Sequence, residues 1–128
     1  MPPNPRQVLK ERLLQERLYR CDGKEILDHA CEPVHAHALE MHEALYSRDD
    51  LPKSKQSYAF DEHNVLLLCP GFHQRYGRSK WLRQKAAELL CTYYGDAAIQ
   101  FYLENAPLKQ PLLLEQLLWA PVDSPPEV

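Results

Sequence analysis

Histidine, asparagine and cysteine side chains recur between residues 31 and 75 at spacings that could build a reaction site. His42 is followed by Asn64, which precedes the apolar run 65–68, and then by Cys69 and His73. A neutral imidazole can accept a proton near pH 7 and can also ligate a transition metal. An asparagine amide can hydrogen-bond backbone on both sides of a loop. Such a set suits phosphodiester hydrolysis, which needs an activated water, a base and positive charge on the phosphate.

The ordered set His42, Asn64 and His73, in the pattern HE…NVLLLC…H, resembles the HNH endonuclease family. The resemblance implies a ββα-metal core, in which a hairpin and a helix hold one divalent cation (Mg, Mn, Ni or Zn). It implies that His42 is the general base or a metal ligand, that Asn64 braces the hairpin loop and that His73 ligates the metal. It also implies that the substrate is DNA, as duplex and with weak sequence preference.

Glu43 stands at a step where many members of the family carry a second histidine. Adjacent strand residues point to opposite faces, so two arrangements stay open. Either His42 and His73 bind the metal and another group is the base, or His42 is the base and a carboxylate or water completes the metal shell. Glu43 is counted with the catalytic candidates. The rival pair Asp28-His29 lies too far upstream to close a hairpin loop of ordinary length.

Two cysteines stand where the family often carries Cys-x-x-Cys pairs that hold a structural zinc. Cys31-Glu-Pro-Val34 and Cys69-Pro-Gly-Phe72 each keep the first thiol only. Because a tetrahedral zinc site takes four nitrogen or sulfur ligands, a residual site would need further donors. The candidate zinc residues are Cys31, His35, His37 and Cys69, with Cys21 as another donor. The other interpretation is that Val34 and Phe72 pack in place of the metal and the thiols are small buried hydrophobes.

The charge distribution places a basic zone after the motif. The chain has 15 basic and 18 acidic residues and a net charge of −3, which argues against broad non-specific binding of DNA. Basic residues nevertheless predominate between residues 53 and 85, and acidic ones after residue 88. A solvated helix face would look the same. The candidate DNA contacts are Arg48, Arg75, Arg78 and Lys80.

Local patterns predict an α+β protein of one domain that is mostly helical. We expect an N-terminal helix over 1–20 that is capped by Asn4, the ββα core over 21–76, helices over 77–120, and a frayed tail over 121–128. The turn signal at Asp22-Gly23 suggests a link between two short strands, residues 58–60 lead toward the strand 65–68, and Gly77 interrupts a helix that Gly95 ends.

No apolar run reaches the ~18 residues of a membrane span, and the charged N-terminus lacks a signal-peptide pattern. We therefore expect a cytoplasmic protein, of a host or of an infected bacterial cell. The leucine-rich segment 112–119 suggests a protein partner. The alternative to a nuclease is an inactive HNH-like binding protein, such as a phage-encoded inhibitor of a host defence nuclease or an accessory of DNA packaging. A helical DNA-binding regulator that uses residues 78–90 is a third hypothesis.

Overall fold

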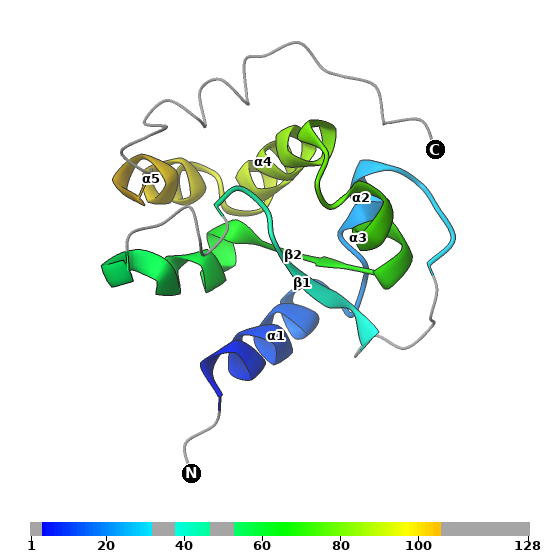
Figure 1. Ribbon diagram of the computed structural model, residues 1–128, viewed down its shortest axis with the longest axis horizontal. Coiled ribbons are helices and arrows are strands. Elements are labelled where there is room, and N and C mark those ends of the chain that lie inside the picture. The colour runs from blue at the N-terminus through cyan, green and yellow to red at the C-terminus, as the bar shows by residue number, and fades with distance from the viewer. Residues whose placement is uncertain (1–3, 32–37, 47–52, 106–128) are drawn as a thin grey trace.

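A computed structural model describes residues 4–31, 38–46 and 53–105 of the chain (Figure 1). Along these residues run α1 (Pro5–Glu16), α2 (Gly23–Ile26), β1 (Glu40–Glu43), the 3₁₀ helices η3 (Lys53–Phe60) and η4 (Glu62–Asn64), β2 (Val65–Leu68), α3 (Pro70–Tyr76), α4 (Lys80–Tyr94) and α5 (Asp96–Asn105). The fold is therefore α+β and mostly helical. The predicted segments 112–119 and 121–128 lie outside the described residues.

The two strands form an antiparallel hairpin at the centre of the described part of the chain (Figure 1). Glu40 pairs with Leu68 at one end of the register, and Glu43 pairs with Val65 at the other. All four residues of β2 are buried, whereas no residue of β1 is. The apolar β2 thus belongs to the core, and the polar β1 keeps one face open to solvent.

Helices cover the hairpin from two sides. In the view of Figure 1, α1 lies below the strands and α4 and α5 lie above them. Leucines of α1 and α4 and one tyrosine of α5 join β2 in one hydrophobic cluster; the largest of them are Leu13, Leu14, Leu82, Leu90 and Tyr102. Full burial of one apolar side chain of this size stabilises the folded state by about 1.5–3 kcal/mol.

The helix ends follow the local signals in the sequence. The Asn4 side chain accepts a hydrogen bond from the Arg6 N–H at 2.9 Å, with Pro5 in the first helical position, as predicted. The predicted interruption at Gly77 separates α3 from α4, whose first turn is capped by the Ser79 hydroxyl at 3.1 Å from the Leu82 nitrogen. Gly95, with φ of +60°, ends α4 as expected, because glycine adopts this region without strain.

Two local predictions were wrong. Asp22-Gly23 opens the short helix α2 instead of joining two strands, and the Leu27 N–H closes its turn on the Gly23 carbonyl at 2.8 Å. The Asp22 carboxylate is buried and accepts a hydrogen bond from the Leu67 N–H at 2.6 Å, so a tertiary contact determines this turn. Residues 58–60 belong to the 3₁₀ helix η3 rather than to a strand approach. Among the described helices, none combines the length and apolar character that crossing a membrane requires.

Candidate functional site

The hairpin and α3 bring two distant histidines together. His42 lies on β1, and His73 lies in the first turn of α3. Their ring centroids are 4.9 Å apart in an edge-on arrangement. Pro70 occupies the first helical position of α3, so the chain turns back toward β1 directly after β2. Two imidazoles at this separation can act on one cation or on one proton.

Glu40 holds the ring of His73. Its Oε1 lies 2.9 Å from Nδ1 of His73, and because a carboxylate accepts, Nδ1–H is the donor. This contact leaves Nε2 of His73 as the lone-pair nitrogen, the arrangement found in carboxylate–histidine–metal sites. The sequence analysis did not single out Glu40. The available signal was its spacing of two residues from His42, which places both side chains on one face of a strand.

His42 is kept neutral by its surroundings. Burial, and then the neighbouring His73, lower the pKa of His42 from 6.5 to about 4. Both causes disfavour the imidazolium form of His42, because that form would lose its hydration and would be repelled by any positive charge on the neighbouring His73 ring. At neutral pH the ring therefore presents a lone pair, which can accept a proton from water or bind a metal ion.

Asn64 ties the segment after β1 to the segment before β2. Its Oδ1 accepts hydrogen bonds from the Leu45 and Tyr46 N–H groups at 3.1 and 3.0 Å. Its Nδ2 donates to the Tyr46 and Ala59 carbonyls at 2.8 and 3.0 Å. The side chain is fully buried, and these contacts use all four hydrogen-bonding positions of the amide. It thereby fixes the backbone three and four residues beyond His42.

The two histidines open into a hollow of about 830 Å³ between β1 and the end of α3. Glu43 lines the same hollow, and so do Arg75 and Arg78. Both arginines are exposed, and the guanidinium of Arg75 lies 5.1 Å over the ring of Tyr76. Lys80 is exposed at the start of α4 but does not line the hollow. The hollow thus combines imidazoles, carboxylates and cations.

A cluster of side chains that could ligate a metal lies near the C-terminal end of β2, where Cys69 follows the strand. One donor atom each from Cys21, His29, Cys31 and Cys69 falls within 4.8 Å of the others. Three thiols and one imidazole match the donor set and number of a tetrahedral zinc site. The cluster could therefore hold a metal ion such as zinc.

Hydrogen bonds prepare this cluster for a cation. His29 Nδ1 donates to the Leu27 carbonyl at 2.7 Å, so Nε2 carries the lone pair. That nitrogen lies 3.3 Å from the sulfurs of Cys31 and Cys69 and 3.8 Å from that of Cys21. The Cys69 N–H donates to the Cys21 sulfur at 3.2 Å. A backbone donor to sulfur and a carbonyl behind the histidine are typical outer contacts of a metal site.

The thiols of Cys21 and Cys31 stay protonated where no cation neutralises them. Burial raises the pKa of Cys21, and burial followed by repulsion from Cys21 raises the pKa of Cys31 to about 12. Metal binding would have to displace these protons, so affinity should rise with pH. The same mutual repulsion disappears when one cation is shared by the three sulfurs.

The predicted zinc residues are brought together only in part. Cys31 and Cys69 meet, and Cys21 joins them, whereas His35, His37 and Val34 lie outside the described residues, as does Arg48. The remaining donor is His29, which the sequence suggested only as part of a rival catalytic pair. Its spacing of two residues from Cys31 was the available signal. Phe72, in the place of a family thiol, packs against the His29 ring with centroids 4.7 Å apart.

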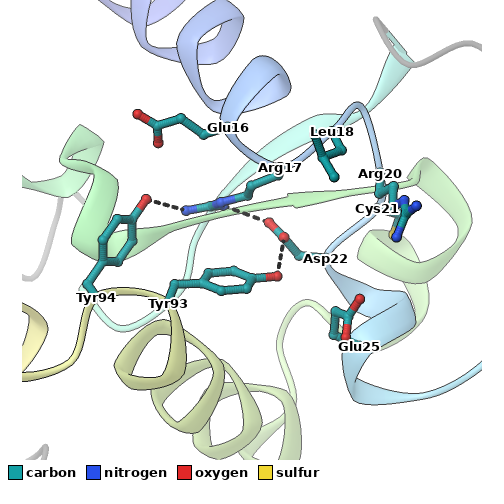
Figure 2. A pocket seen from close by; sticks show the side chains of 9 residues that line it. All are labelled: Glu16, Arg17, Leu18, Arg20, Cys21, Asp22, Glu25, Tyr93 and Tyr94. Atoms are coloured by element: carbon teal, nitrogen blue, oxygen red, sulfur yellow. Dashed lines mark hydrogen bonds and ion pairs between the residues drawn. The ribbon is translucent and has the colours of Figure 1, made fainter.

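A buried ion pair between Arg17 and Asp22 lies next to the thiol cluster and was not predicted from the sequence. Figure 2 shows Arg17 reaching from the end of α1 to Asp22, with Tyr93 and Tyr94 of α4 closing the group. Arg17 Nη1 lies 2.6 Å from Asp22 Oδ2 and donates to the Val65 carbonyl at 2.7 Å. The Tyr93 hydroxyl donates to the other oxygen of Asp22 at 2.8 Å. The network fixes the backbone next to Cys21 against both β2 and α4.

No protein-family model matches this chain, and the searches of curated proteins and of solved structures found no significant match either. What the protein does is therefore inferred from its side-chain geometry.

Proposed function

We propose that this chain is a metal-dependent DNA endonuclease of the HNH type that hydrolyses phosphodiester bonds. The observation that carries the proposal is the edge-on contact of His42 and His73, 4.9 Å apart, in a strand–strand–helix unit. Asn64 adds support, because its four hydrogen bonds hold the loop that follows His42. Three residues in this order, His42, Asn64 and His73, carried by a hairpin and the following helix, are what the resemblance to the family implies.

The surroundings of each residue indicate its role in the proposed reaction. His42 is the general base, since its depressed pKa leaves it neutral at pH 7 and a nearby phosphate would raise its basicity. His73 holds the cation through Nε2, oriented by Glu40 at its other nitrogen. Glu43 lines the same hollow and is the candidate carboxylate for the remaining position. Arg75 and Arg78 contact the phosphate backbone.

A divalent cation at His73 would supply positive charge to the scissile phosphate and stabilise the leaving oxygen. Imidazole and carboxylate donors accept Mg²⁺, Mn²⁺, Ni²⁺ or Zn²⁺ with different preference. The residue types that line this hollow suit such an ion, because they include the imidazole of His73 oriented by Glu40, the neutral imidazole of His42 and the carboxylate of Glu43.

The thiol cluster has a structural role in this proposal. Four protein ligands close a zinc site and leave no position for water, so the chain's own residues there would hold structure rather than activate a nucleophile. Cys69 is the N-cap residue of α3, and His73 donates its backbone N–H to the Cys69 carbonyl at 2.9 Å. A metal held by Cys69 would therefore fix the start of the helix that carries His73.

Supercoiled plasmid tests the nuclease directly. Purified protein with each of Mg²⁺, Mn²⁺, Ni²⁺ and Zn²⁺ should convert the plasmid to nicked or linear form, and His42→Ala or His73→Ala should lower the rate about 100-fold or more. His63→Gln is the matched control, because His63 is also paired with a carboxylate, at 2.5 Å from Asp61, but lies outside the hollow. No cutting with any of these metals at low salt would contradict the proposal.

Measuring both the nicking rate and the affinity for Mn²⁺ in the His42→Ala variant separates the two roles open to His42. As the base, His42→Ala leaves the affinity for Mn²⁺ unchanged while the rate falls. As a metal ligand, it lowers both. The inactive HNH-like binding protein would instead bind its partner without His42 and without added metal.

A further inference from the structure

Two hollows meet at His73, and the second one is lined by the N-terminal helix. The first is the hollow of His42, with Arg75 and Arg78 at its α3 end. The second measures about 410 Å³ and is lined by Arg6, Gln7 and Lys10 of α1. Both contain Glu40, Met41 and His73 in their walls. The histidine site therefore lies in the middle of a longer depression rather than at its end.

Cations stand at both ends of this depression. Arg75 and Arg78 are exposed at one end, and Arg6 is exposed at the other. Arg6 and Lys10 are one helical turn apart, so their side chains share a face of α1. The middle of the depression is occupied by the imidazoles and by Glu40. The depression therefore has cationic side chains at both ends and the histidine pair in the middle. This arrangement suits a strand of regularly spaced phosphates with the scissile phosphate at the centre.

Arg6 is held in place before any ligand arrives. Its guanidinium carbon lies 4.4 Å over the ring of Phe60, at the end of η3. A stacked guanidinium keeps its N–H groups for other acceptors, and a side chain already ordered loses less entropy when it binds. The contact thus presents the charge at the rim of the second hollow.

We propose that α1 forms the second arm of a DNA-binding groove, in which Arg6 and Lys10 contact backbone phosphates on the side of His73 opposite to Arg75 and Arg78. This inference rests on the proposed nuclease function for the nature of the ligand. It adds residues of the N-terminal helix to the substrate surface and predicts that duplex DNA crosses the histidine site with phosphate contacts on both sides.

The test measures binding of a labelled DNA duplex by fluorescence anisotropy over a range of salt concentrations. It uses the full chain with His42→Ala and Mn²⁺, so that the DNA stays intact. Each phosphate contact contributes about 0.9 to the slope of log affinity against log salt. The double substitution Arg6→Ala, Lys10→Ala should lower this slope by about 2, and Arg6→Lys, Lys10→Arg should restore it.

The matched control is Arg20→Ala, Lys24→Ala, which removes two exposed cations that line neither hollow. This control should leave the salt slope within about 0.5 of the slope measured for the chain that carries His42→Ala alone. Circular dichroism of each variant checks that α1 has kept its helix. Equal slopes for the α1 variant and the control, or no binding of duplex at low salt, would overturn the groove.

The outcome is distinguishable from failure of the proposed nuclease. A wild-type chain that binds duplex with the α1-dependent slope but nicks no plasmid supports the groove and contradicts the nuclease. A chain that nicks plasmid while the α1 variant binds like the control supports the nuclease and overturns the groove.

Discussion

The thiol cluster and the pair of His42 and His73 differ in both donor type and access. The thiol cluster offers three sulfurs and one imidazole, which together fill a tetrahedral shell. The histidine site offers imidazoles and carboxylates on the wall of an open hollow. Soft donors in a closed set favour a structural zinc, whereas harder donors with open positions favour a reactive cation. In the proposed function, this difference gives the thiol cluster a structural role and the histidine pair a reactive one.

The two regions are also mechanically linked. Cys69 and His73 belong to the same turn at the start of α3, and the backbone hydrogen bond between them is 2.9 Å long. The first region can therefore be altered without touching the donors of the second, but its loss should displace His73. Substitutions that change stability without changing the histidine pair, or the reverse, therefore test whether the two regions differ in role.

The largest effect is expected from the thiol cluster. Cys69→Ala should abolish binding of one zinc ion and lower the free energy of unfolding by more than about 4 kcal/mol, because binding energy at a structural site is folding energy. Metal analysis and urea unfolding measure the two effects, and a chelator should reproduce the loss. Cys91→Ser is the control, a half-buried thiol of α4 outside the cluster. Equal zinc content in both variants would contradict the assignment.

The next largest effect on stability is expected at Asn64, which ties the loop after His42 to the segment before β2. Asn64→Ala removes four buried hydrogen bonds and leaves backbone groups without partners, which should cost about 3–4 kcal/mol. Asn64→Asp keeps the acceptor and should cost less. Thermal unfolding of the zinc-loaded protein measures both. Nicking should fall even where the variant is folded, since the loop after His42 loses its tie. An Asn64→Ala variant with wild-type stability would show that the loop is held elsewhere.

A smaller effect is expected at the carboxylate behind His73. Glu40→Gln removes the charge that orients the ring, and outer contacts of this kind are worth about 10–100-fold in metal affinity. Titration with Mn²⁺ by calorimetry measures it. Because Glu40 is exposed, the melting temperature should hardly change. Unchanged Mn²⁺ affinity would remove Glu40 from the site.

The smallest effect is the pH dependence of stability in the metal-free protein. The pKa of His42 is about 4 in the folded chain against 6.5 for a free imidazole, so between these values the unfolded chain binds the proton and the folded chain does not. Stability should therefore rise with pH across this window, by about 2 kcal/mol. His42→Gln should flatten the rise. His73 is the neighbouring group that adds to burial in lowering this pKa, and unfolding midpoints at fixed pH values measure the difference.

Local signals in the sequence predicted what local geometry decides. Asn4, Pro5, Gly77 and Gly95 act on the residues next to them, so the start of α1 and the two ends of α4 were predictable. The grouping of His42, Asn64 and His73 was expected only from the resemblance of their order to a known family.

Contacts between distant segments were not predictable in the same way. His29 reaches Cys69 across 40 residues, and Arg17 reaches the Val65 carbonyl across 48. Asp22 was interpreted as a turn residue, because its burial depends on contacts with β2 and α4 that lie far away in the sequence. A single sequence carries no signal for such partners beyond residue type.

Anomalous diffraction from crystals grown with zinc and soaked in Mn²⁺ would locate both cations in one experiment. We expect a zinc peak among Cys21, His29, Cys31 and Cys69 and a manganese peak beside His42 and His73. Zinc among the thiols with no manganese at the two imidazoles would contradict a reactive metal centre there.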